Sequence, residues 1–122
     1  MNDNQNNSNR FYSDLNSVAK DVEKAADDRI KEIKSERKDD LKSIKSETKD
    51  LKQEVKEGYK DFKEVKKASD DPFAKDIISA AKQESKDIKK NIETDYEQTK
   101  NKIEEEADNR IESIKRMNEK NS

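Results

Sequence analysis

The residues of this chain that could do chemistry are carboxylates and amines. The sequence holds 30 Asp and Glu and 28 Lys and Arg, but it has no His and no Cys. It therefore lacks the commonest general base, the commonest metal ligand and any thiol nucleophile. With one glycine in 122 residues, it also has no Gly-rich loop for a phosphate. We expect no enzymatic activity, no cofactor and no small-molecule substrate.

The densest carboxylate cluster is Glu104-Glu105-Glu106. A calcium loop places its ligands around a glycine turn, and this segment has no such spacing. Runs of charge in helical phase are normally solvated surface. We interpret the cluster as an exposed acidic face and expect no metal site.

The balance of charge also bears on nucleic acids. The net charge is −2 and the isoelectric point is about 5.4. Domains that bind nucleic acids usually have a basic face and an isoelectric point above about 9. No nucleic-acid partner is therefore expected.

The composition limits the kind of core that could position any of these residues. Hydrophobic residues make up 27% of the chain and charged residues 48%. Typical globular domains have about 45–50% and 25% respectively, so a thick core is excluded. Low hydrophobicity is also typical of disorder, but the small net charge, the periodic apolar residues and the single Gly and Pro favour continuous helix.

The apolar residues recur every eleven positions, a spacing that favours long helices. Eleven residues make three helical turns at about 3.67 residues per turn, so the stripe runs straight or drifts slightly right-handed. We predict an all-α fold of two long helices that form an antiparallel helical hairpin or coiled coil. The residues that define the two repeats are Val22, Ile33, Ile44 and Val55, followed by Ala81, Ile92, Ile103 and Ile114.

The predicted boundaries divide the chain into five segments. Residues 1–10 are polar and Asn-rich and are expected to form a disordered tail. The first helix covers residues 11–68, and the second covers 72–118. A turn at 69–71 joins them, and residues 119–122 form a frayed end.

Two residues mark the turn, and one glycine interrupts the first helix. Asp71 can cap the second helix through its carboxylate, and Pro72 fits the first helical position because no N–H is needed there. Gly58 lies inside the first helix, where glycine costs about 1 kcal/mol relative to alanine. We interpret Gly58 as a tolerated, exposed glycine, although a bend or a close helix contact would also explain it.

A short turn makes neighbouring helices antiparallel, and this fixes a pairing register. Residues that face each other should have numbers that sum to 143 or 144. Several layers then combine a large side chain with a small one, as a close-packed seam requires. The predicted layers are Phe62–Ala81, Tyr59–Ser85, Val55–Ile88, Leu51–Ile92, Thr48–Tyr96, Ile44–Thr99, Leu41–Ile103, Arg37–Ala107, Ile33–Ile111 and Ile30–Ile114.

Charged residues flank this stripe in a regular order. In the first helix the residue after a stripe position is usually lysine, and the residue before it is often acidic. In the second helix the following residue is mostly acidic, so antiparallel packing brings lysines to acids on that flank. On the other flank acids face acids as far as Lys102 and Arg110. A parallel dimer of first helices would match both flanks, and the charges leave it open as an alternative.

The register leaves residues 11–25 without a partner in the same chain. This overhang carries Phe11, Leu15, Val18 and Val22, which we predict to be the partner-binding residues. The expected partner is a second copy of the chain or another helical protein. The predicted function is that of a non-enzymatic coiled-coil scaffold, spacer or oligomerisation module.

The eleven-residue pattern also leaves a lipid-surface function open. It resembles the repeats of exchangeable apolipoproteins, synuclein-type proteins, group 3 late-embryogenesis-abundant proteins and rotary-ATPase peripheral stalks. That resemblance lies in periodicity and composition, so no residue roles are carried over from it. It implies a peripheral membrane or stress-protective helix as the alternative, although the narrow, Ile-rich stripe without Trp suits helix packing better. The sequence has no signal peptide and no apolar run of about 18 residues, so cytoplasmic residence is expected.

Overall fold

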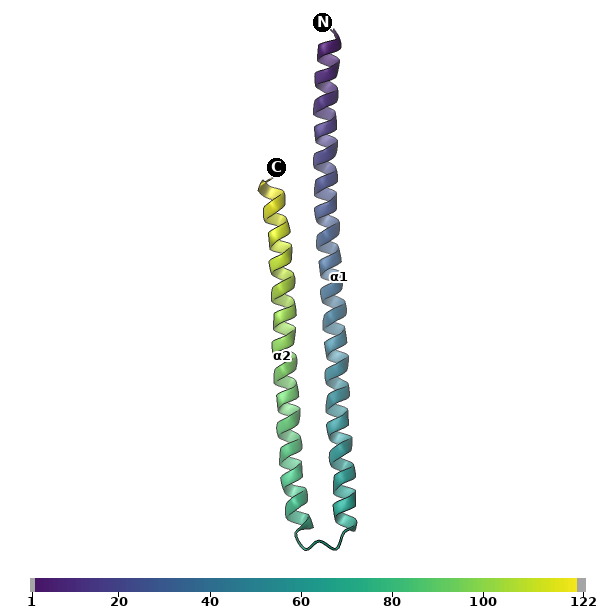
Figure 1. The fold of residues 1–122 in the computed structure, drawn as a ribbon, viewed down its shortest axis with the longest axis vertical. Helices are drawn as coiled ribbons and strands as arrows, with labels where there is room; N and C mark the ends of the chain where they lie inside the picture. The colour runs from purple at the N-terminus through teal and green to yellow at the C-terminus, as the bar shows by residue number, and fades with distance from the viewer. Residues whose placement is uncertain (1, 121–122) are drawn as a thin grey trace. The chain divides into compact units, whose positions relative to one another are not determined.

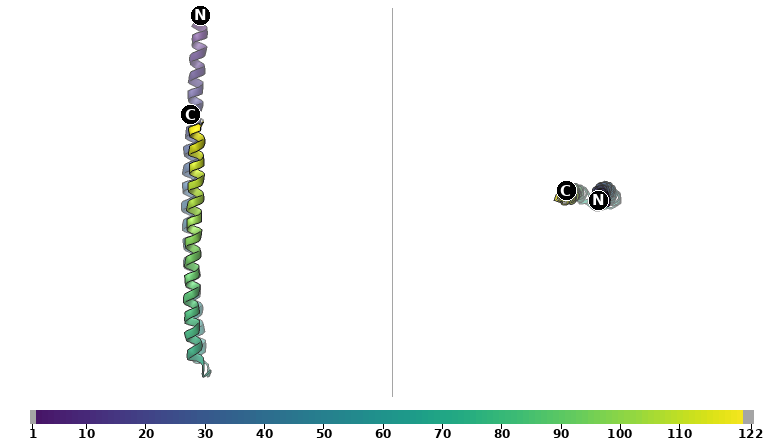
Figure 2. Two further views of the ribbon diagram at one scale, coloured as in Figure 1. Left: turned by 90° about the vertical axis from the view of Figure 1, so that its left-hand side faces the viewer. Right: turned by 90° about the horizontal axis from the view of Figure 1, so that it is seen from above.

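A computed structural model describes the backbone of residues 2–120 and the side chains of residues 10–119. Helix α1 spans Asn2–Ala68 and helix α2 spans Ala74–Lys120. The described residues contain no strand, and the two helices pack against each other in opposite directions (Figures 1 and 2). The predicted all-α helical hairpin is therefore confirmed.

Contacts within the hairpin define two units, which we describe separately. Unit 1 combines the N-terminal part of α1, up to Lys38, with the C-terminal part of α2, from Glu104. Unit 2 contains Asp39–Ile103, which includes the turn.

Unit 1 contains the best-buried layers among the described residues. Its core consists of Ile33, Ala107 and Ile111, and Ile33 exposes only 2% of its surface. Ile30 and Ile114 pack against this cluster. These five residues belong to the predicted layers 37–107, 33–111 and 30–114, so the register holds in this unit.

Unit 2 follows the same register with less burial. Ile44, Thr48 and Leu51 line one groove together with Ile92 and Tyr96. A second groove is lined from both helices by residues that the register pairs. Its lining residues are Val55, Gly58, Tyr59, Phe62, Ala81, Glu84, Ser85 and Ile88. The predicted pairing therefore holds in unit 2 as well.

The stripe does not continue to the turn as the spacing predicts. Val65 continues the three- and four-residue spacing of the apolar positions after Phe62, but it is 69% exposed, whereas Lys63 and Lys66 are half-buried. Near the turn the seam follows residues 59, 63 and 66, and the long lysine side chains can cover apolar surface with their stems.

The turn is held by the caps of both helices. At the end of α1, the Ser69 hydroxyl donates to the Lys66 carbonyl oxygen at 2.7 Å. At the start of α2, the Phe73 N–H donates to Asp71 Oδ1 at 2.9 Å. Asp71 also pairs with Lys66, with Nζ and Oδ2 3.6 Å apart. The predicted capping role of Asp71 is therefore confirmed.

Two helix ends differ from the sequence-based boundaries. Helix α1 begins at Asn2 rather than at Phe11, because the polar segment before Phe11 contains no Gly or Pro to stop a helix. The expected tail over residues 1–10 is therefore helical from Asn2. Helix α2 begins at Ala74 rather than at Pro72, because Pro72 and Phe73 form the turn that the Asp71 carboxylate holds.

We expect the Asp71→Ala variant to lose about 1 kcal/mol of unfolding free energy, because it removes the helix cap. Urea denaturation followed by circular dichroism measures this loss. The matched control is Asp70→Ala, since Asp70 is exposed and makes none of these contacts. Equal losses in the two variants would contradict the capping role.

Gly58 offers a stabilising substitution. It has no positive φ, and a Cβ added there would meet nothing within 4 Å. We therefore expect Gly58→Ala to raise the unfolding free energy by about 1 kcal/mol through helix propensity alone. A higher urea midpoint with an unchanged slope would support this, and a lower midpoint would contradict it.

Candidate functional site

The predicted partner-binding residues lie in the N-terminal part of unit 1. Phe11, Leu15, Val18 and Val22 are between 46% and 62% exposed. They recur at helical spacing on one side of α1, so they form a continuous apolar stripe. Helix α1 extends past the end of α2 here (Figure 1), as expected for the overhang predicted over residues 11–25. From here on the overhang means residues 10–23, which have described side chains and no described α2 residue opposite them in the register.

The register explains why this stripe is exposed. Extended by the sum of 144, the register pairs Asn118 of α2 with Ala26 of α1, and both residues are half-buried. Residues before about position 24 have no described α2 residue opposite them. The only aromatic ring contact described is local: Phe11 and Tyr12 meet edge to face with centroids 6.2 Å apart.

The charged flanks meet in the predicted way in unit 2, where Lys52 forms an ion pair with Glu93. In unit 1, Asp108 of the acidic flank pairs instead with Arg37, a residue predicted for the stripe, with Nη1 and Oδ1 2.9 Å apart. Exposed pairs of this kind contribute about 0.2–1 kcal/mol each, so they select orientation more than they hold the fold.

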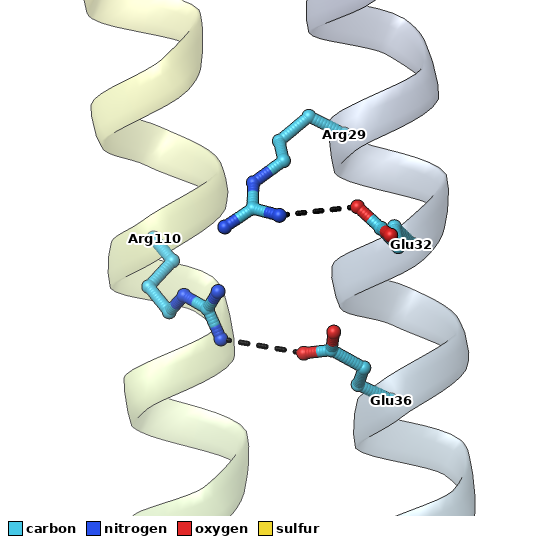
Figure 3. Close-up of polar contacts among 4 residues, drawn as sticks. All are labelled: Arg29, Glu32, Glu36 and Arg110. Atoms are coloured by element: carbon cyan, nitrogen blue, oxygen red, sulfur yellow. Dashed lines mark hydrogen bonds and ion pairs between the residues drawn. The ribbon is translucent and has the colours of Figure 1, made fainter.

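On the other flank, arginines of unit 1 neutralise acids. Figure 3 shows Arg110 of α2 reaching across to Glu36 of α1, with Nη1 and Oε2 3.5 Å apart. Beside it, Arg29 pairs with Glu32 on α1 at 3.1 Å. The predicted entry of Arg110 into this flank is therefore confirmed.

Sequence reasoning missed an exposed apolar surface in unit 2. Leu51, Phe62 and Ile88 were expected inside the seam, but they are 38–48% exposed. The lysine that follows each of them, Lys52, Lys63 and Lys89, is half-buried instead. The two helices are thus rotated so that part of the apolar stripe faces outward. One sign of this exposed surface was present in the predicted register, which places acidic residues of α1 opposite acidic residues of α2 on that flank.

The acidic segment Glu104-Glu105-Glu106 belongs to α2. Glu104 is half-buried while Glu105 and Glu106 are exposed, and no group of three described carboxylates is placed to hold a metal ion. No described helix has the length and hydropathy needed to cross a bilayer.

Comparison with protein-family models, with curated proteins and with solved structures finds no match to this chain.

Proposed function

We propose that this protein is a non-enzymatic assembly module that joins two copies of the chain through their overhangs. The observation that carries the proposal is the stripe of Phe11, Leu15, Val18 and Val22, which is exposed although it is in phase with a packed seam. Contiguous exposed apolar residues of this kind usually mark an interaction surface.

The overhang is complementary to itself in the antiparallel direction. If facing residues sum to 33, Phe11 meets Val22 of the second copy and Leu15 meets its Val18. A two-fold axis passes between residues 16 and 17. It therefore produces the Phe11–Val22 layer twice and the Leu15–Val18 layer twice. Such isologous contacts close into a dimer rather than a filament. The paired stretch, residues 10–23, is also the stretch that lacks an α2 residue opposite it.

Charge favours the antiparallel arrangement over a parallel one. In antiparallel packing, the residues that precede the stripe in one copy face the residues that precede it in the other. This brings Arg10, which precedes Phe11, near Asp21 of the second copy, which precedes Val22. A parallel pair would set the residue before Val22 against the residue after it. That contact would place Asp21 against Glu23, two like charges.

Cysteine crosslinking tests both the association and its direction. The described chain has no cysteine, so Leu15→Cys and Val18→Cys introduce single reactive groups. Mixing the two variants under oxidising conditions should give mainly the 15–18 heterodimer. Mainly 15–15 and 18–18 products would indicate a parallel pair. A strictly monomeric chain in equilibrium sedimentation would reject the proposal.

The lipid-surface alternative is less well supported. Among the exposed apolar residues of unit 2, Leu51, Phe62 and Ile88 line grooves whose charged lining residues include Glu47 and Glu84 but no lysine. An anionic bilayer would repel this flank. Circular dichroism and flotation with anionic vesicles separate the two functions, since the assembly module is helical without vesicles and does not float with them.

A further inference from the structure

The two grooves of unit 2 are copies of one another at a spacing of eleven residues. Ile44, Glu47, Thr48 and Leu51 line the first groove from α1. Eleven residues further on, Val55, Gly58, Tyr59 and Phe62 line the second. The α2 linings obey the same rule: Ile92, Asp95, Tyr96 and Thr99 lie eleven residues after Ala81, Glu84, Ser85 and Ile88. The grooves are therefore about 16 Å apart along the helices.

Both grooves open on the same flank, and that flank is acidic. Of the residues that precede a stripe position between 39 and 98, none is Lys or Arg. Within the described part of the chain, none of the groove-flank carboxylates forms an ion pair. These carboxylates belong to Glu47, Asp50, Glu54, Asp61, Glu84, Asp87 and Asp95.

In unit 1 the chain itself supplies a cation to the corresponding flank. Glu36 lies eleven residues before Glu47, and its carboxylate is bound by Arg110 (Figure 3). In unit 2 the residues eleven and twenty-two positions before Arg110 in α2 are Thr99 and Ile88. Neither carries a charge, so unit 2 supplies no cation of its own for this flank.

We propose that this face of unit 2, which we call the acidic groove face, binds a cationic amphipathic helix of another protein. The partner needs large apolar residues eleven positions apart, one for each groove. It also needs Lys or Arg on both sides of that stripe, to meet the carboxylates of α1 and α2. A helix laid in a groove with such anchors is a common mode of peptide recognition.

A second copy of this chain does not meet these requirements. Two acidic groove faces would set carboxylates against carboxylates. The lysine flank of a second copy offers charge, but the stripe residues Leu41 and Ile78 are half-buried there. Its overhang offers the apolar stripe, but Asp14, Asp21 and Glu23 outnumber Arg10 and Lys20 there.

A substitution at Gly58 tests the proposal. Gly58 lines the second groove, and no atom lies within 4 Å of a Cβ built on it. We expect a leucine at this position to occupy part of the groove, since its Cβ meets no atom within 4 Å, and to raise helix propensity. Gly58→Leu should therefore block a partner while the hairpin stays folded, which circular dichroism checks.

The probe is a fluorescent synthetic helix of two eleven-residue units, with leucine on the stripe and lysine on both flanks. Fluorescence anisotropy at physiological salt should show that the full chain binds it. A peptide of the same composition in scrambled order, and one with glutamate in place of lysine, should bind at least ten-fold more weakly. Equal binding of the scrambled peptide would overturn the proposal, because it would reveal charge attraction without a groove.

Protein variants locate the binding face. Gly58→Leu, and separately the Glu47→Lys/Glu84→Lys pair, should each weaken binding at least ten-fold. The matched control is Glu57→Lys/Glu64→Lys, which changes the same charge on exposed residues outside both grooves and should change binding less than about two-fold. Equal effects in the test and control pairs would overturn the proposal.

Two outcomes separate this inference from the overhang dimer. The Leu15→Asp/Val18→Asp variant should bind the peptide as the unaltered chain does. Loss of peptide binding in that variant would move the site to the overhang and overturn the inference. Loss of self-association in Gly58→Leu would assign the groove face to a second copy, which also overturns it.

Discussion

Replacing Ile33 with alanine should remove about 2–5 kcal/mol of unfolding free energy, the largest loss that we expect from a single substitution in this chain. Ile33 exposes 2% of its surface and packs in one cluster with Ala107 and Ile111. Shortening the side chain deletes buried methyl groups and leaves a void that α1 and α2 fill only by moving together. Small domains have only about 5–15 kcal/mol of stability, so the variant loses a large share of it.

Urea denaturation of Ile33→Ala, followed by helix content, measures this loss. The matched control is Val65→Ala, which also removes methyl groups but from a side chain that is 69% exposed. Its effect should stay within about 0.5 kcal/mol. If the two variants lost similar amounts, the burial pattern described for the hairpin would be wrong.

The second large effect concerns association. We expect the Leu15→Asp/Val18→Asp variant to weaken the overhang dimer about 100-fold or more. Burying an aliphatic side chain contributes about 1.5–3 kcal/mol, and a symmetric dimer loses four such side chains. A loss of about 3 kcal/mol already corresponds to about 100-fold in the dissociation constant. Two buried carboxylates per copy add a desolvation cost.

Sedimentation equilibrium over a dilution series measures this change. The matched control is Ser13→Asp/Lys20→Gln, which changes the net charge by the same amount on the face of α1 opposite the stripe of Phe11, Leu15, Val18 and Val22. Its dissociation constant should change only a few-fold. An equal loss in the control would mean that net charge, and not the apolar stripe, governs association.

The pairing of the two helices could be predicted from the sequence. The proline after Asp71 located the turn, and the turn fixed which residues face each other. The volumes in the layers then supported the register, as with Arg37 opposite Ala107. Ile33, Ala107 and Ile111 form the observed core, and Val55 and Ile88 line one groove, as this register requires.

The rotation of each helix about its own axis could not be predicted. Lys52 and Leu51 are neighbours on the helix surface, and either can turn toward the seam when the lysine stem covers apolar surface. The energy difference between such rotations is spread over many layers. The spacing of the apolar positions shows which side of a helix is apolar. It does not show which residues lie at the centre of the contact with the other helix. The acidic groove face was missed for this reason, because Leu51, Phe62 and Ile88 were assigned to the interior.

The start of α1 differs for a related reason. Residues 1–10 contain no apolar stripe, and this led to the expectation of a tail. Helix formation needs an unbroken backbone as well as a packed face, and no Gly or Pro interrupts the segment from Asn2 onward. The apolar periodicity therefore predicts which face of a helix packs, but not the residue at which the helix begins.

The capped turn has a kinetic consequence. The Ser69 hydroxyl and the Lys66 carbonyl are three residues apart, whereas Arg37 and Asp108 are 71 residues apart. Closing a loop costs about 0.6 kcal/mol for each doubling of its length, so forming the Arg37–Asp108 contact first would cost about 2.5–3 kcal/mol more than starting at the turn. We therefore expect the hairpin to fold as a zipper that starts at Asp71. The best-buried layer, at Ile33, then joins late, so its loss should speed unfolding more than it slows folding.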